Sequence, residues 1–354
     1  MLEKPDLADE ALAAHVRDRY GLEVSGIEFL ALGADVDAAA YGVLVAAGYG
    51  AGKYGSGGRG PYFLKLRRGP ANDPKVRLQA FLAAAGSTCV LAPQSALDGM
   101  LTTRIGEFSA ILYPFVAGRS GFDADLTDDQ WFVLGSALRA VHGVQLPAVL
   151  RKPLRVEDYS ARWREKVRAY LTRSASVQAR THAPDAAAKE LVEVLAARHE
   201  HIATIVARAE LLAARLREKP RPQVLCHGDI HAGNVMVADD GSIALVDWDE
   251  PVLAPRERDL MFIGGGVGGV WTAAPEYTAC YDEFYRGYGP ASVDAEAIAY
   301  YRYERIVEDI AVCCDQLLLS AEGGEDRALG LRFFLDQFRP GDVVEIADLT
   351  FTTV

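Results

Sequence analysis

Apolar and polar residues follow two different periods along the first third of the chain. Residues 7–20 carry apolar side chains at helical spacing, and Gly21 is the type of residue that commonly ends a helix. A second helix is predicted over residues 74–85. Shorter apolar runs around these helices predict strands at residues 24–32, 41–47, 61–67 and 110–113. This region therefore predicts a sheet accompanied by helices.

The rest of the chain is mostly helical in its periodicity. Thr127 and Gln130 form the sequence pattern of a capping box, which predicts a helix extending to about His142. Helical patterns also cover residues 156–170, 186–219 and 292–338. The apolar stripe within 186–219 is typical of a helix packed on a core, and a coiled-coil partner helix would show the same stripe.

Length and charge narrow the class of protein. A chain of 354 residues is too long for one ordinary core and suits two domains. The formal charge of −12 argues against a nucleic-acid partner, and it suits either a cationic substrate or simple solubility. No apolar run reaches the length of a membrane span and no secretory signal is visible, so we expect a cytoplasmic protein with no membrane partner.

The five cysteines do not form a disulfide framework. Cys313 and Cys314 are adjacent, and Cys89, Cys226 and Cys280 stand in apolar contexts. These last three are interpreted as small core residues, and the compartment is expected to be reducing.

Three polar residues stand at the ends of apolar segments in the middle of the chain. Asn234 lies five residues after Asp229, and Asp247 lies eighteen after it. This is the spacing of a kinase catalytic base and two Mg²⁺ ligands. Phosphoryl transfer requires hard oxygen ligands for a metal that meets the charge on the phosphates. We expect Asp229 to orient the acceptor hydroxyl and take its proton, and Asn234 and Asp247 to bind Mg²⁺.

Two other readings of this segment stay open. A β-hairpin with Asp-Asp-Gly at its turn would also leave polar residues at its ends. A zinc site formed by His227 and His231 would need a helix, and Gly228 and Gly233 favour a loop instead.

Three glycine-rich stretches resemble nucleotide-binding loops without fitting them. Residues 55–60 match the dinucleotide pattern but lead into a strand, whereas that pattern must open a helix, so we expect a flexible hairpin. Gly52-Lys53 fails as a P-loop because Ala47 stands where the first glycine belongs and Tyr54 where a Ser or Thr must bind the metal. Residues 264–269 have poor helix propensity, and a mobile loop near the acceptor is expected there.

The motif His227-Gly228-Asp229, with Asn234 and the segment 246–249, resembles the aminoglycoside phosphotransferase and choline kinase-like superfamily. Residues 33–35, 62–66, 111–116, 126–131 and 249–261 extend the resemblance, which points to the spectinomycin 9-O-phosphotransferase branch. The resemblance implies an α+β, bilobal protein kinase-like fold. Its lobes would be 1–113, with an antiparallel sheet, and the mainly helical 119–354, with a hinge at 114–118 and a helical insert at about 151–220.

The resemblance also assigns nucleotide contacts. Lys65 would reach the α- and β-phosphates, although a lysine snorkelling from a sheet edge would look the same. Gly33 and Asp35 belong to the loop over ATP. The carbonyl of Pro114 and the N–H of Val116 would bind adenine.

Supporting residues follow from the same resemblance. His227 would hold the catalytic loop in shape, and Asp259 would brace it. Kinases commonly anchor the phosphate-binding lysine with a helical glutamate, but residues 74–85 contain no acid. Asp73, a carboxylate from elsewhere, or no partner at all are the alternatives for Lys65.

Acidic residues are the candidates for the acceptor site. Asp249, Glu250, Glu308 and Asp309 could bind a cationic substrate, although a solvated helix face gives the same pattern in the last two. The function expected is Mg²⁺-dependent transfer of the γ-phosphoryl of ATP, or of GTP, to a hydroxyl of an aminocyclitol such as spectinomycin. A kinase for another antibiotic, a nucleoside-type metabolite, choline or a sugar, and a nucleotide-binding pseudokinase scaffold, are the alternatives.

Overall fold

The computed structural model describes residues 4–32, 37–45, 62–69, 74–174, 184–272, 274–320 and 323–354. The chain forms two compact units, each assembled from separated segments. Unit 1 comprises residues 1–154, 229–251 and 283–289, and unit 2 comprises residues 155–228, 252–282 and 290–354. The lobe boundary at 114–118 stays a prediction.

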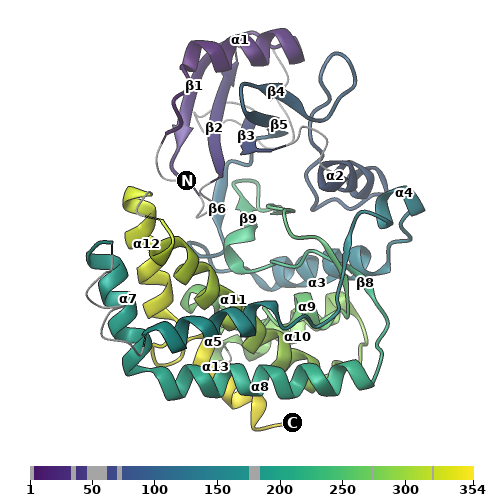
Figure 1. Ribbon diagram of the computed structural model, residues 1–354. Helices are drawn as coiled ribbons and strands as arrows, with labels where there is room; N and C mark the ends of the chain where they lie inside the picture. The colour runs from purple at the N-terminus through teal and green to yellow at the C-terminus, as the bar shows by residue number, and fades with distance from the viewer. Residues whose placement is uncertain are drawn as a thin grey trace. The chain divides into compact units, whose positions relative to one another are not determined.

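Unit 1 begins with an antiparallel sheet in the order β1-β2-β3-β5-β4. Its strands are β1 (Val24–Leu30), β2 (Ala38–Val45), β3 (Tyr62–Arg68), β4 (Thr103–Ile105) and β5 (Phe108–Pro114). Helix α1 (Asp9–Tyr20) packs on this sheet and ends at Gly21, whose φ of 69° is readily adopted by glycine (Figure 1). Leu12, Val16, Leu64 and Leu112 belong to the shared apolar core. The predicted sheet is confirmed.

The rest of unit 1 surrounds a second, three-stranded sheet in the order β10-β9-β6. Its strands are β6 (Gly118–Ser120), β9 (Val235–Ala238) and β10 (Ile243–Leu245). Strands β9 and β10 pair as a hairpin around the Asp-Asp-Gly turn, which was one of the interpretations left open by the sequence. Three helices accompany this sheet and the first one: α2 (Pro74–Ala84), α3 (Asp128–Gly143) and α4 (Ala148–Arg151). The capping box predicted at Thr127 and Gln130 is confirmed at the start of α3.

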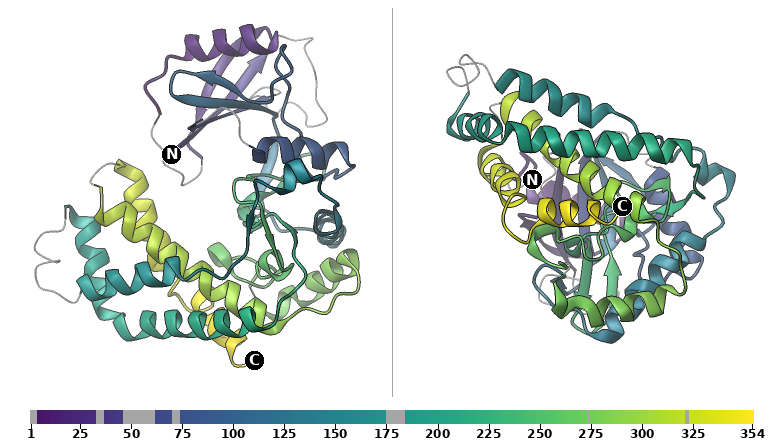
Figure 2. Two further views of the ribbon diagram at one scale, coloured as in Figure 1. Left: turned by 45° about the vertical axis from the view of Figure 1, so that its right-hand side comes forward. Right: turned by 90° about the horizontal axis from the view of Figure 1, so that it is seen from below.

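Unit 2 is mainly helical and centres on the long helix α11 (Ala295–Leu318). Helices α5 (Arg162–Ser174) and α8 (His199–Glu218) pack against α11 and against each other (Figure 2). The remaining elements of unit 2 are α7 (Ala186–Ala197), α9 (Glu257–Leu260), η2 (Val267–Gly269), η3 (Pro275–Tyr277), α12 (Gly324–Asp336) and α13 (Val343–Phe351). Helix α10 (Thr278–Tyr288) is divided between the units, since its residues from 283 onward belong to unit 1. A small sheet in the order β7-β11-β8 joins Arg155–Val156, Val252–Ala254 and Val224–Cys226.

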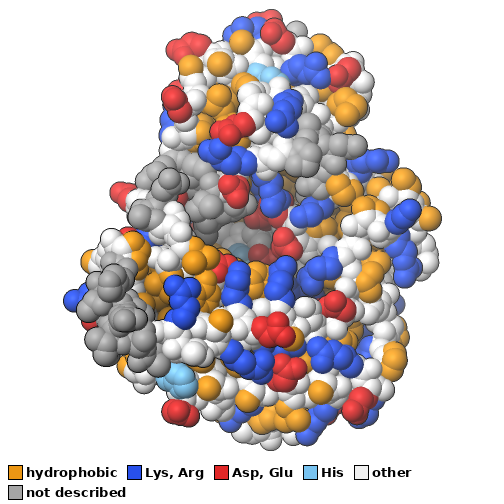
Figure 3. All heavy atoms as spheres, in the orientation of Figure 1, with side chains coloured by type: hydrophobic (Ala, Val, Ile, Leu, Met, Phe, Trp, Pro, Cys, Tyr) orange, Lys and Arg blue, Asp and Glu red, His pale blue; other side chains and the backbone are white. Residues whose placement is uncertain are grey.

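Basic and acidic side chains are interspersed on the outer face of α5 and α8 (Figure 3). Arg164 and Arg168 both pair with Glu210 across these two helices, at 3.1 and 3.3 Å. Arg164 is fully buried and also pairs with Glu304 of α11. The charges of this predicted insert therefore tie its helices to α11.

Two predicted helices differ in their bounds. The helix expected at 156–170 begins only at Arg162, because Arg155 and Val156 join a sheet instead. The helix expected at 186–219 is interrupted at Arg198, whose φ of −103° and ψ of 14° are not helical. Its apolar stripe is buried in unit 2 at Leu191, Leu195 and Ile202. The α+β fold class is confirmed.

The glycine-rich residues 264–269, where a mobile loop was predicted, belong to the described part of the chain. They contain the short 3₁₀ turn η2, and Gly264, Gly266, Gly268 and Gly269 all have positive φ. In the described residues, no helix is both long and apolar enough to cross a membrane.

Candidate active site

The turn before Asp229 is held by a buried carboxylate. Strand β8 ends at Cys226, and the next two backbone N–H groups, of His227 and Gly228, each donate to Asp259 at 2.8 Å. Asp259 is fully buried on α9. Hydrogen bonds to a charged acceptor are stronger than neutral ones. The chain thus enters Asp229 from a fixed turn, in which Gly228 has a φ of 87°.

Asn234 closes the loop that follows Asp229. Its amide Nδ2 donates to the carbonyl oxygen of Asp229 at 2.7 Å, and its side chain is buried. The backbone N–H of Val246 donates to the carbonyl of Asn234 at 3.0 Å. The five residues of separation seen in the sequence therefore become a closed loop, and β9 and β10 bring the Asp247 segment beside it.

Asp247 has an uncommon backbone conformation. Its φ is 60°, which non-glycine residues adopt rarely and often at functional sites. The next residue anchors the segment, because the indole N–H of Trp248 donates to the carbonyl of Leu245 at 3.1 Å and its ring is buried. The Asp247 carboxylate remains 48% exposed.

Lys65 of β3 meets two carboxylates. Its Nζ lies 2.8 Å from Asp247 Oδ1 and 2.9 Å from Asp249 Oδ2. Burial alone would lower the pKa of Lys65, but Asp247 and then Asp249 outweigh it and raise the pKa above its usual value. A charged lysine is therefore fixed beside Asp247, and the carboxylate partner that the sequence left open is found in the chain after β10.

The side-chain chemistry at this place fits a divalent cation. Because Asn234 uses its amide nitrogen toward Asp229, its amide oxygen is turned to the other side and can act as a ligand. Asp247 adds a carboxylate, and these are the hard oxygen donors that Mg²⁺ prefers. Asn234 and Asp247 are the residues that would hold such an ion.

His231, which the sequence offered only as a zinc ligand, lies close to Asp229. Its ring stacks on Phe122, with the centroids 5.3 Å apart, and its Nδ1 accepts from the N–H of Gly233 at 3.0 Å. This contact directs Nε2 toward Asp229 Oδ2, at 3.7 Å. Residues 227–231 are not helical, and the 3₁₀ turn η1 (Ala232–Asn234) begins only after His231, so the helical i, i+4 pairing that a zinc site with His227 requires is not formed.

The remaining predicted nucleotide-binding residues lie at the end of β5 or outside the described part of the chain. Pro114 ends β5, and Val116 follows it, half-buried. Gly33 and Asp35 lie outside the described residues. Their nucleotide contacts remain predictions.

The acidic candidates are also spread over several elements. Asp249 pairs with Lys65, whereas Glu250 is exposed in the same segment. Glu308 and Asp309 stand on α11, and Asp309 accepts from Arg305 at 2.9 Å. The acceptor role of these four acids remains a prediction.

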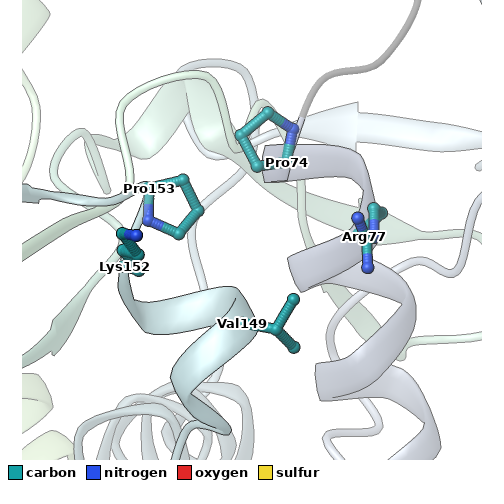
Figure 4. Close-up of a pocket in the computed structure, with 5 residues that line it drawn as sticks. All are labelled: Pro74, Arg77, Val149, Lys152 and Pro153. Carbon is teal, nitrogen blue, oxygen red and sulfur yellow. The ribbon is translucent and has the colours of Figure 1, made fainter.

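A surface hollow in unit 1 is lined by other residues. It is formed at the start of α2 and at α4, where Val149 faces α2 (Figure 4). Its lining contains two basic side chains and no acid: Pro74, Arg77, Val149, Lys152 and Pro153. None of the predicted catalytic or metal-binding residues lines it.

The constellation of Lys65, Asp229, Asn234 and Asp247 is that of an ATP-dependent phosphotransferase. The model of the phosphotransferase enzyme family matches residues 46–304, and the chain belongs to this family. Protein StrN of Streptomyces griseus is 25% identical over 231 residues, which are 63% of this chain and 70% of StrN.

Solved structures agree with this family assignment. A crystal structure of the spectinomycin phosphotransferase APH(9)-Ia, in complex with ADP and spectinomycin, is 35% identical. The match covers 98% of this chain and 99% of that chain, with a TM-score of 0.86. The amicoumacin kinase hAmiN, in complex with AMP-PNP, Ca²⁺ and Ami, is 15% identical with a TM-score of 0.58 over 96% of this chain and 97% of its own. The second likeness concerns the fold alone.

Proposed function

We propose that the protein transfers the γ-phosphoryl group of ATP, with Mg²⁺, to a hydroxyl of an aminocyclitol antibiotic such as spectinomycin. The observation that carries the proposal is the likeness to APH(9)-Ia over nearly the whole of both chains. The structure of APH(9)-Ia contains ADP and spectinomycin. The consequence would be resistance by modification. A cytoplasmic location, where ATP is available, accompanies this proposal.

The catalytic role belongs to Asp229. Its carboxylate accepts a hydrogen bond from the acceptor hydroxyl and takes the proton as that oxygen bonds to the γ-phosphorus. The bond from the γ-phosphorus to the β–γ bridging oxygen breaks, and ADP leaves. The rigid turn held by Asp259 and the closing bond from Asn234 fix the backbone on both sides of this carboxylate. A fixed orientation matters because a positioned base lowers the barrier without any reorganisation during the reaction.

Lys65 binds the nucleotide phosphates with its fixed ammonium group. Asn234 and Asp247 would hold the metal, which when bound would neutralise charge on the phosphates. The adenine contacts of Pro114 and Val116, and the loop over ATP that contains Gly33 and Asp35, complete the proposed nucleotide site. Asp259 and His227 act as support for the loop.

The acidic candidates for the acceptor are Asp249, Glu250, Glu308 and Asp309. A protonated amine on the acceptor would be attracted to such carboxylates. The overall negative charge of the chain suits a cationic acceptor of this kind.

A competition assay tests the acceptor class. The purified protein is given Mg²⁺ and ATP with an equimolar mixture of spectinomycin, several aminoglycosides, a nucleoside antibiotic and choline, and the products are identified by mass spectrometry. The proposal expects spectinomycin to be consumed first. Preferential consumption of another member would keep the reaction and replace the acceptor, and parallel reactions with GTP would show the nucleotide preference.

A further inference from the structure

Helix α2 cannot supply the carboxylate that commonly anchors the phosphate-binding lysine of a kinase. Its sequence from Pro74 to Ala84 contains no Asp or Glu. The buried polar residue of this helix is Gln79, and its amide oxygen accepts from the hydroxyl of Tyr113 at 2.7 Å. The helix therefore offers an amide that is already engaged with a neighbouring strand.

Asp249 is surrounded by cations instead. One carboxylate oxygen, Oδ2, lies 2.9 Å from Lys65 Nζ and 3.0 Å from Arg67 Nη1. Lys65 and Arg67 are two positions apart on β3 and so point to the same face of the strand. The ammonium of Lys75, on α2, donates to the backbone carbonyl of Asp249. Helix α2 thus contacts the Asp249 segment through a basic residue.

The two carboxylates beside Lys65 differ in exposure. The Asp247 side chain is 48% exposed, whereas that of Asp249 is 28% exposed. The more open carboxylate suits a metal that must enter and leave with the nucleotide. The more buried carboxylate, shared with Arg67, suits a permanent partner of the lysine.

We propose that Asp249 is the positioning residue that holds Lys65 in place of a helical glutamate. The proposal rests on the proposed function for its kinase chemistry. When Asp247 binds the metal, Asp249 still fixes the direction of the lysine, and Arg67 and Lys75 fix Asp249. Asp249 therefore acts through Lys65 on the nucleotide phosphates.

A double-mutant cycle tests this coupling. The kcat/KM for ATP is measured for the wild type, Asp249→Asn, Lys65→Gln and the double variant. We expect each single variant to lose at least about tenfold, and the double variant to lie within about threefold of Lys65→Gln alone, because contacting residues are non-additive. Losses that multiply in the double variant would overturn the proposal.

A matched control uses another acid of unit 1. Asp239 is exposed in the turn between β9 and β10. We expect any loss of kcat/KM caused by Asp239→Asn to multiply with the loss caused by Lys65→Gln when the two are combined. Asp249→Glu keeps the charge, recovers part of the activity lost in Asp249→Asn, and serves if the amide variant folds poorly. No recovery in a folded Asp249→Glu would count against a charge-based role.

A second cycle needs no acceptor. The affinity for ADP, measured by calorimetry, should show the same non-additivity between Asp249→Asn and Lys65→Gln. If no tested acceptor is phosphorylated, the proposed function fails while the ADP cycle still decides the role of Asp249. If the losses of ADP binding free energy in the two single variants simply add in the double variant, and both single variants lose the same amount of melting temperature, Asp249 is only a structural residue.

Discussion

Replacing Asp259 by Asn should destabilise the protein and slow catalysis, because one carboxylate oxygen becomes an NH₂ group. The carboxylate is fully buried and accepts from two backbone N–H groups at 2.8 Å. An amide has a single acceptor oxygen, so one N–H would face an NH₂ group. A buried donor left without a partner costs about 1–3 kcal/mol, and bonds to a charged acceptor contribute about 1.5–3 kcal/mol each. We expect the free energy of unfolding to fall by about 2–4 kcal/mol.

The assay combines stability and kinetics. Urea unfolding followed by tryptophan fluorescence gives the stability, and kcat is measured well below the unfolding transition. The kcat should fall while KM for ATP changes little, because Asp259 holds the turn that leads into Asp229 and not the nucleotide. Asp128→Asn is the control, since Asp128 is exposed in the first turn of α3 and should change stability by less than about 0.5 kcal/mol. Wild-type stability and kcat in Asp259→Asn would refute the reasoning.

Three further predictions concern single sites. Gly233→Ala should lower kcat, because a Cβ there would lie 2.3 Å from a ring carbon of Phe122, which stacks on His231 beside Asp229. Gly143→Ala is the control: a Cβ there would have nothing within 4 Å and should be tolerated. Tyr41→Phe should raise the urea midpoint at neutral pH, since the buried hydroxyl has no hydrogen-bond partner among the described residues. Burial raises the pKa of Tyr41 from 10.0 to about 12, so the wild type loses stability as pH rises through this interval and the advantage of the variant should grow; a constant difference would contradict this. Arg164→Met should destabilise by about 3–5 kcal/mol and Arg286→Met by less than about 1 kcal/mol in the same urea assay, because only the first leaves a buried acid unpaired; equal effects would refute the distinction.

The buried acid in the last comparison adds a pH signature. Burial, opposed by Arg164, raises the pKa of Glu304 to about 7. Once Arg164 is removed, Glu304 can enter the core only by taking up a proton. The deficit of Arg164→Met should therefore be smallest below pH 7, where Glu304 is protonated in both folded proteins, and grow as the pH rises above 7.

The elements of the fold were predictable where periodicity and local signals agreed. The capping box at Thr127 and Gln130 and the Asp-Asp-Gly turn each involve residues close in sequence, so their chemistry can be read directly. The interruption at Arg198 was not predictable, because the apolar stripe continues through it while the backbone leaves the helical conformation. The late start of α5 depends on pairing of Arg155 and Val156 with a distant strand.

The same division applies to the site. The spacing of Asp229, Asn234 and Asp247 is visible in the sequence because one hairpin sets it. The partner of Lys65 is not, since Asp249 lies 184 residues away and only the tertiary fold brings the two together. His231 carried one available signal, its place two residues after Asp229, but its stacking on Phe122 depends on a contact that the sequence does not reveal.

The most direct test of the account is the reaction of the purified protein and its Asp229→Ala variant with ATP, Mg²⁺ and spectinomycin, followed by mass spectrometry and by circular dichroism of both proteins. The account predicts singly phosphorylated spectinomycin with the wild type and almost none with a variant of unchanged fold. Wild-type rates from Asp229→Ala would contradict the catalytic assignment, and an unreactive wild type would contradict the proposed acceptor.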